Sequence, residues 1–475
     1  MSTEDRLHQM MSNVGQGDVD QSTWADFVAV AHRSHTKHRI LTAIAVVGVV
    51  AAASVGTAAV LNQDGIDRDT LPADRNIVPV PIPVDVPRDC PTAPDVTEGA
   101  LGTVAYLGAT ELHVVDVASG DDSILVQAGP GFGEGFFSDE VRISPDGQWV
   151  SFGGGLMVPT AGGDICAPLG QGVHDLQWTP DGRAVALSDG SLIVGGPGRE
   201  PIPIAPEFDG TRYEGYAFES FVLSPDGERA AVAAVGKNQA DLWVVDFRTM
   251  PEVVRFSVSA EEFGGVSVAG WDPDGRWVLF WNRTLQDSES VNADGSPFRA
   301  VNLETGEVTT ITDYMVSERD QLTWCGDRLV FTDGMGRLVQ DQKVIAAAQP
   351  PSWDKGVLRA AEGVSYVDPA CDGPGRNLAA IETATAGSSV SSLLRWTDGG
   401  DELDGLLPPS GRGFLHPQLS QDGATVVAEL MTDKTGVANE VVVIDGEGMR
   451  TLGILGAQSS FPLMGGSPTW DWHHP

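Results

Sequence analysis

Short apolar runs separated by polar turns recur along most of this chain. In the first clear unit, the runs Val141 to Ile143 and Trp149 to Phe152 flank the turn Ser144-Pro145-Asp146-Gly147. Proline presets the second turn position, serine caps the turn with its side chain, and glycine takes the left-handed conformation that ends it. The pattern predicts a β-hairpin, in which the serine and the aspartate serve the turn through local hydrogen bonds.

The same turn returns further along the chain. Its other copies are Thr179-Pro180-Asp181-Gly182, Ser224-Pro225-Asp226-Gly227, Asp272-Pro273-Asp274-Gly275 and, in degraded form, Ser420-Gln421-Asp422-Gly423. A propeller blade takes roughly 40 to 50 residues, and the gap from Asp274 to Asp422 is about three such steps. Two more hairpins are therefore expected in this gap, and residues 322–331 and 368–381 have the matching pattern.

Each unit continues with a second pair of β-rich runs, which predicts four strands per unit. One additional second half, residues 111–120, precedes the first turn and lacks an inner strand, whereas residues 467–472 resemble an inner strand with no hairpin after it. We expect this C-terminal strand to complete the first blade and close a ring. The predicted fold is all-β: a β-propeller over residues 101–475 with eight four-stranded blades, or seven as the alternative count.

The repeated Ser-Pro-Asp-Gly turn, followed by an apolar strand, resembles the repeat of bacterial TolB-like, WD-repeat-like β-propellers. The resemblance covers roughly residues 100–475. It implies the fold, but it does not imply one function, because this repeat occurs in binding proteins, in enzyme side-domains and in sensors.

The segment before the propeller contains a long apolar span. Residues 40–61 hold no charge and no proline, and a helix of this length extends about 33 Å, enough to cross a bilayer. Basic residues precede the span and acidic residues follow it, so the positive-inside rule places residues 1–39 in the cytoplasm and the propeller outside. We expect a single-pass protein of the cell membrane; a cleaved signal peptide is the alternative interpretation.

Two further features concern this N-terminal part. Gly48, Ala52 and Gly56 form a stripe of small residues that would let two such helices approach closely, although spans rich in alanine and glycine produce such stripes by chance. Residues 62–100 are rich in proline and predict an extended extracytoplasmic spacer between membrane and propeller.

The four cysteines all lie on the outer side of the predicted span. An even number in an oxidising compartment predicts two disulfides. Cys325 and Cys371 occupy equivalent turn positions in consecutive hairpins, so we pair them, and Cys90 with Cys166 then ties the spacer to the second blade.

Charge and chemistry narrow the function classes. The net charge of −37 excludes nucleic acid as a general partner and favours cationic ligands. No Gly-x-Ser-x-Gly nucleophile motif is present, and the propeller histidines His113, His174 and His416 are scattered without metal-ligand spacing. His32, His35 and His38 are three residues apart, but we interpret them as part of a basic flank beside the membrane, and His473-His474 as a C-terminal tail. We therefore predict no catalytic residue, no cofactor, no metal and no enzyme, with a hydrolase or lyase acting in the propeller channel as the alternative.

Two functions fit this anatomy. The first is a membrane protein that presents its propeller for binding of a protein, a peptide or a glycan. The second is a transmembrane regulator that resembles anti-sigma-factor-like proteins, with residues 1–39 holding a transcription factor. The tail contains no cysteine, so the zinc-binding His-Cys-Cys pattern of that group is absent.

Overall fold

The computed structural model describes the chain between Pro79 and His473 with gaps. The described residues are 79–82, 86–94, 102–108, 110–127, 141–204, 207–208, 211–212, 217–235, 240–248, 252–256, 263–284, 296–315, 319–333, 343–347, 355–357, 364–372, 375–384, 391–397, 402–406, 408–409, 412–431, 439–446, 448–455 and 470–473. The predicted membrane helix, its stripe of small residues and the cytoplasmic segment lie outside these residues. Within them, no helix is long and apolar enough to cross a membrane.

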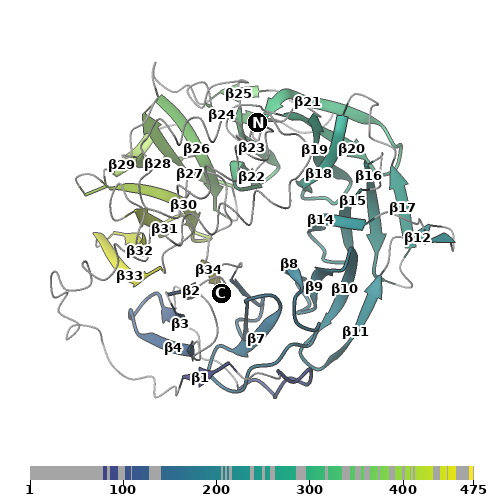
Figure 1. The fold of residues 1–475 in the computed structure, drawn as a ribbon. Coiled ribbons are helices and arrows are strands. Elements are labelled where there is room, and N and C mark those ends of the chain that lie inside the picture. The colour runs from purple at the N-terminus through teal and green to yellow at the C-terminus, as the bar shows by residue number, and fades with distance from the viewer. Residues whose placement is uncertain are drawn as a thin grey trace, which may run out of the picture. The chain divides into compact units, whose positions relative to one another are not determined.

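Six antiparallel sheets of four strands follow one another along the chain (Figure 1). From the innermost strand outward, the first three are β8 (His174–Trp178), β9 (Ala184–Ser188), β10 (Ser191–Gly196) and β11 (Arg199–Ile204); β14 (Ala217–Leu223), β15 (Arg229–Val235), β16 (Ala240–Asp246) and β17 (Glu252–Phe256); and β18 (Phe263–Trp271), β19 (Trp277–Thr284), β20 (Ser296–Asn302) and β21 (Val308–Met315). A two-stranded hairpin, β12 (Glu207–Phe208) with β13 (Thr211–Arg212), lies between the first two in sequence.

The other three four-stranded sheets complete the series. They are β22 (Leu322–Cys325), β23 (Arg328–Asp333), β24 (Lys343–Ala347) and β25 (Lys355–Val357); β26 (Val364–Cys371), β27 (Asn377–Ala384), β28 (Ser391–Thr397) and β29 (Glu402–Leu406); and β30 (Gly413–Leu419), β31 (Val426–Met431), β32 (Asn439–Asp445) and β33 (Gly448–Ile454). A short 3-10 helix, η3 (Arg319–Gln321), leads directly into β22.

The ring closes in a five-stranded sheet that joins both ends of the described chain. Its strands, in order, are β1 (Val80–Pro81), β4 (Asp122–Gln127), β3 (Glu111–Asp116), β2 (Thr103–Leu107) and β34 (Trp470–His473). β34 is antiparallel to β2, with Trp472 opposite Val104 and Trp470 opposite Tyr106. Trp470 and Trp472 pack into one apolar core with Val441 and Val443 of the last sheet, so hydrogen bonds and apolar packing both hold the closure.

The prediction of eight four-stranded blades is wrong in one unit. Within the described residues, seven sheets have four or five strands, which gives a propeller of seven full blades; the unit around the first turn forms only β5 (Arg142–Ile143), β6 (Trp149–Phe152) and β7 (Leu156–Pro159). In place of an outer strand, the chain after β7 makes a single bridge from Met157 to Cys166. Gly162, Gly163, Gly170 and Gly172 there all have positive φ, a conformation that interrupts an extended strand.

The strands are buried on both faces because each sheet packs between two others. In β15, Ala230, Val232 and Ala234 belong to the core shared with β9 and β10. The alternate residues Ala231 and Ala233 belong to the core shared with β18 and β19. This two-sided burial explains why the sequence of these strands is continuously apolar rather than alternating.

The described part of the proline-rich spacer lies against the propeller. β1 adds to the first sheet as a parallel edge strand, with Val80 opposite Val126, and Ile82 is 5 % exposed. An edge is where a strand accommodates a proline such as Pro81, because proline has no N–H to donate. The Ala167 N–H donates to the Pro87 carbonyl over 2.8 Å, so this stretch is docked and does not stand away from the blades.

Candidate functional site

The predicted turn residues bond within their own turns. The Ser144 hydroxyl donates to Asp146 Oδ1 over 2.5 Å and accepts the Trp149 N–H over 2.9 Å, while the Gly147 N–H donates to the Ser144 carbonyl over 2.8 Å. The turns at Thr179, Ser224 and Ser420 repeat this arrangement with Asp181, Asp226 and Asp422, and with Gly182, Gly227 and Gly423. The serine and aspartate side chains of these turns are thereby engaged in turn formation, as the sequence predicts.

The turn at Asp272 uses a carboxylate in place of a hydroxyl. Asp272 Oδ1 accepts the N–H groups of Arg276 and Trp277 over 2.6 and 2.7 Å, and the Gly275 N–H closes the turn over 2.9 Å. Burial raises the pKa of Asp272, and the backbone N–H groups of Trp277 and Arg276 act in the opposite direction.

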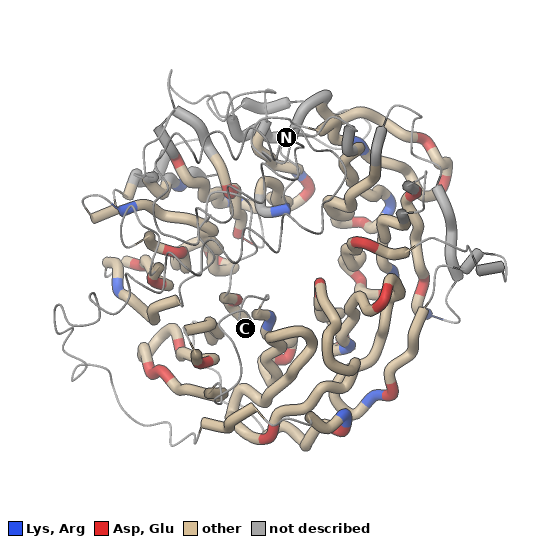
Figure 2. Tube along the Cα trace, in the orientation of Figure 1, with Lys and Arg blue, Asp and Glu red and all other residues tan. Residues whose placement is uncertain are grey.

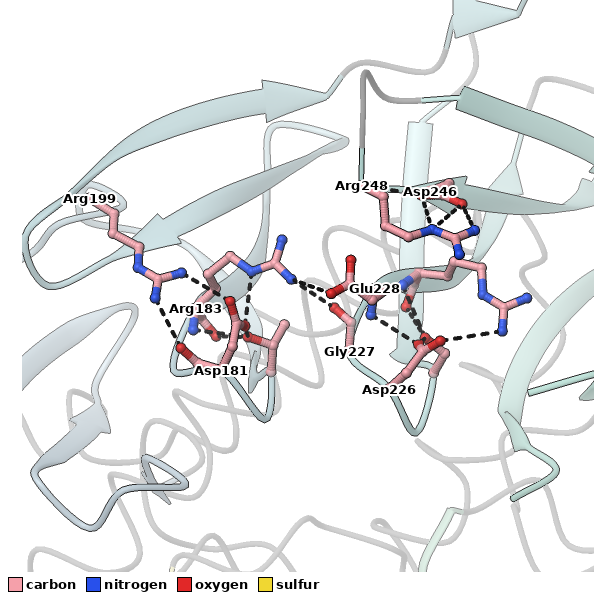
Figure 3. A network of polar contacts seen from close by, with 11 residues as sticks. Asp181, Arg183, Arg199, Asp226, Gly227, Glu228, Asp246 and Arg248 are labelled. Atoms are coloured by element: carbon pink, nitrogen blue, oxygen red, sulfur yellow. Dashed lines mark hydrogen bonds and ion pairs between the residues drawn. The ribbon is translucent and has the colours of Figure 1, made fainter. Parts of the chain in front are cut away.

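Arginines connect each of two turns to the next blade, and Figure 3 shows the first of these connections, from Arg183 to Gly227. Arg183 binds Asp181 of its own turn over 3.0 Å and reaches the Gly227 carbonyl of the following turn over 3.4 Å. Arg229 makes the same kind of contact one blade further on, because it donates to the Gly275 carbonyl over 2.9 Å. Burial alone would raise the pKa of Asp181, but hydrogen bonds from Thr179, Arg183 and Arg199 outweigh it and lower this pKa to about 2.

A disulfide makes the corresponding connection further round the ring. Cys325 and Cys371 lie at the turn ends of β22 and β26, with their Cα atoms 5.3 Å apart. The second disulfide joins Cys90 of the spacer to Cys166, Cα to Cα 5.1 Å. Both are the pairs expected from the sequence, and all four cysteines are bonded.

A second set of polar residues lies on the innermost strands, four residues before their turns. We call Asp175, Gln321, Asp368 and His416 the bulge set, because three of them sit at β-bulges of β8, β26 and β30, and Gln321 precedes β22 at the same distance from its turn. Asp175, Asp368 and His416 have φ values of 53°, 50° and 47°. Residues with a Cβ seldom take this left-handed conformation, and such strain, like bulges, concentrates at functional sites.

Asp175 binds groups from two other elements, the strand β14 and the helix η3. Its Oδ2 accepts the Phe221 N–H of β14 over 3.3 Å, and its Oδ1 lies 3.3 Å from Arg319 Nη1 of η3. Arg319 also donates from Nε to the Val268 carbonyl of β18 over 3.2 Å. The guanidinium is thus fixed by two sheets other than the one its helix precedes, and 37 % of the side chain stays exposed.

The other three members of the bulge set bind one another in sequence around the ring. The Gln321 amide donates to Asp368 Oδ1 and its carbonyl accepts the Asp368 N–H over 3.4 Å. The His416 N–H donates to Asp368 Oδ2 over 3.2 Å, and His416 Nδ1 lies 3.7 Å from the same carboxylate. Gln321 therefore holds the inner strand β26 of the next blade, and Asp368 holds β30 of the one after it.

Glu429 of β31 lies behind this row and is 1 % exposed. The amide of Asn439 donates to its Oε1. Burial raises the pKa of Glu429, which His416 and Asn439 lower in part and Asp368 raises further. A buried acid beside a histidine and a second carboxylate, close to backbone in a left-handed conformation, marks a candidate functional site.

The sequence contains a pattern that points to the bulge set, although the turn motif alone does not reveal it. Aligned on their turns, all four residues fall at one register of the repeat, and proline follows two of them, Asp368 and His416. Charge alone gave no such signal, since acidic and basic residues are interspersed over the described sheets (Figure 2). Among the described residues, no three His, Cys, Asp or Glu side chains are placed to hold a metal ion.

Comparisons with known proteins show the fold alone. No protein-family model and no curated protein matches the chain. Among solved structures, the dihydro-heme d1 dehydrogenase NirN in complex with DHE is 13 % identical, with 78 % of this chain and 76 % of that chain covered and a TM-score of 0.53. A putative dipeptidyl aminopeptidase IV from Bacteroides ovatus is 10 % identical (77 % and 60 % covered, TM-score 0.47). TolB from Acinetobacter baumannii is 12 % identical (64 % and 63 % covered, TM-score 0.33).

The likeness to the dehydrogenase overturns the prediction that the protein is not an enzyme. That prediction rested on a complete propeller without a nucleophile motif. A dehydrogenase has a similar fold over about three quarters of its chain, so a propeller of this kind does not separate enzymes from binding proteins. The chemistry has to be judged from the site residues.

Proposed function

We propose that the protein is a ligand-binding β-propeller held on the outer side of the cell membrane by the helix at residues 40–61, and that its ligand is a peptide segment of another protein. The observation that carries this proposal is the bulge set with Arg319. Inner strands of three sheets and the helix η3 bring polar groups together there, and three of these residues have strained backbone, which folding alone does not require.

The chemistry of these groups favours a peptide. The Arg319 guanidinium, 37 % exposed, offers donors and the partly exposed Asp175 carboxylate offers acceptors, whereas Gln321 and Asp368 are buried and hold the strands behind them. A peptide backbone carries donors and acceptors at short, regular spacing. The exposed Glu219, at the bulge of β14 between Phe218 and Ser220, adds an acceptor on a neighbouring inner strand. The acidic net charge of −37 favours a peptide with basic residues.

The two disulfides support the proposed location. Disulfides persist in oxidising compartments and are rare in the cytosol, and both bridges belong to the part of the chain that follows the apolar span. A reporter that folds only outside the cytoplasm should be active when fused after Pro475 and inactive when fused after Arg39. The reverse pattern would refute the topology.

Site-specific photocrosslinking tests the binding surface. A photoreactive residue replaces Glu219 on β14 in the full-length, membrane-embedded protein, and a matched variant replaces Glu200 on β11, the outer edge of a neighbouring sheet; both side chains are exposed. We expect a peptide crosslink from position 219 that weakens in an Arg319→Ala background and is absent from position 200. Equal labelling at both positions, a glycan adduct, or no adduct at position 219 would contradict the proposal.

A further inference from the structure

The surroundings of Glu429 are incomplete if its carboxyl is ionised. Glu429 is 1 % exposed and Asn439 is 3 % exposed, and the amide of Asn439 donates to Glu429 Oε1. Among the described residues, Glu429 Oε2 and the Asn439 carbonyl oxygen both lack a hydrogen-bond donor. Two buried acceptors without a donor, side by side on β31 and β32, are costly.

One proton satisfies both acceptors. A protonated carboxyl has one O–H donor, and a side-chain amide has one carbonyl acceptor. If Oε2 carries the proton, it donates to the Asn439 oxygen while the Asn439 amide donates to Oε1. The two side chains then form a reciprocal pair with two hydrogen bonds, and no formal charge is buried.

We propose that Glu429 and Asn439 form a proton-binding site, in which Glu429 is a neutral carboxylic acid in the folded protein and exchanges its proton as the seam of the propeller opens. The seam is the packing between the last sheet, which contains both residues, and the closing strand β34. This site adjoins the proposed peptide surface, because His416 and Asp368 border both, but its test measures stability and protonation and does not depend on peptide binding.

The neighbouring groups place the site at this seam. The indole N–H of Trp470 on β34 faces the carboxyl of Glu429 and favours its ionised form, although it makes no hydrogen bond of normal geometry to an acceptor among the described residues. His416 of β30 favours the ionised form of Glu429, and Asp368 of β26 opposes it. Because Asp368 also lies beside His416, these two neighbours partly offset one another, and burial decides the protonation state.

The raised pKa of Glu429 fixes the sign of the pH effect. A group whose pKa is higher in the folded state stabilises the fold fully below its unfolded pKa, which is about 4.5. Between the unfolded and the folded pKa, the unfolded chain has released a proton that the folded chain retains. The contribution is therefore lost as the pH rises through the folded pKa. The seam therefore weakens with rising pH.

Two substitutions at this position separate the proposal from a merely structural role. Glu429→Gln reproduces the neutral, reciprocal pair without a titratable proton, whereas Glu429→Ala leaves Asn439 unpaired beside a cavity. The full-length protein is heated at a series of pH values from about 5 to about 9, the range over which a raised carboxyl pKa takes effect. Glu200→Gln, on the exposed edge strand β11, removes a carboxylate elsewhere as the control.

We expect the Tm of Glu429→Gln to match wild type near pH 5 and to exceed it increasingly as the pH rises. Glu429→Ala should be destabilised at every pH, and Glu200→Gln should follow wild type throughout. The infrared difference spectrum between wild type and Glu429→Gln should contain the carbonyl band of a protonated carboxylic acid at neutral pH. A carboxylate band instead, or a Glu429→Gln variant as unstable as Glu429→Ala at all pH values, would overturn the proposal.

Discussion

The turns end the inner strands and the bulge set lies four residues before them, yet their polar groups are satisfied in different ways. At the turn, Ser144 and Asp146 bond partners two to five residues away. At the bulge, Asp368 accepts the N–H of His416, 48 residues further along the chain. The turn is a local structure that each repeat makes by itself, whereas the bulge exists only when two blades are already side by side.

This difference explains which residues vary between repeats. A local turn selects the same residues every time, so Asp and Gly recur in five turns. A bulge faces a different neighbour in each blade, so the corresponding positions hold Asp175, Gln321, Asp368 or His416. Variation at an otherwise repeated position therefore points to contacts between blades, and at this propeller it points to the candidate site.

We expect the largest loss of stability from a substitution in a turn that packs tightly against another blade. A Cβ on Gly375, with φ of 70°, would lie 2.1 Å from the backbone nitrogen of Gly326, whereas a Cβ on Gly182, with φ of 77°, would meet nothing within 4 Å. Gly375→Ala should cost about 2–5 kcal/mol from left-handed strain plus overpacking, and Gly182→Ala only the strain, about 1–2 kcal/mol. Chemical denaturation of both variants measures the gap; equal losses would show that the turns are independent of their neighbours.

We expect an intermediate loss of stability from a substitution in the bulge set. Asp368→Ala leaves the buried Gln321 amide without its acceptor, which costs about 1–3 kcal/mol. The His416 N–H also loses its acceptor, but it is only partly buried, so it adds less. The matched change at a turn, Asp146→Ala, removes an exposed acceptor that water replaces, so it should cost less than about 1 kcal/mol. If urea midpoints fall equally in both variants, the distinction between local and inter-blade bonding does not hold.

We expect the smallest loss of stability from removing the charge of a turn aspartate, and this loss should depend on pH. The pKa of Asp181 is lowered to about 2, so its ionised form stabilises the fold above its unfolded pKa of 3.8 and this contribution is lost as the pH falls through about 2. Because 53 % of the side chain is exposed, Asp181→Asn should lose less than about 1 kcal/mol at pH 7. Thermal scans at falling pH should show the two proteins converge by about pH 2; a gap that persists there would mean the loss is not electrostatic.

The features that could be predicted are those with a local or periodic cause. Pro and Gly at fixed turn positions predicted the hairpins, and Cys325 and Cys371 at equivalent positions predicted their disulfide. Trp470 and Trp472 lacked a hairpin of their own, which pointed to a closing strand. The three-stranded unit was missed because glycines with positive φ replace its outer strand, and glycine allows that conformation without requiring it.

The candidate site could not be predicted because its cause is not local. Nothing near Glu429 in the sequence indicates that Asn439, His416 and Trp470 surround it. The spacer is a similar case, since its prolines predict an extended chain and leave open whether that chain is free or docked beside β4.

By itself, the sequence determined the unit of the fold, because each hairpin and turn depends on residues within about ten positions of one another. Only the tertiary structure decided how the units differ: which blade remains three-stranded, where the spacer attaches, and which polar side chains meet on the inner strands. Those contacts join residues more than forty positions apart. Their free energy therefore depends on the closed ring, and no single repeat contains it.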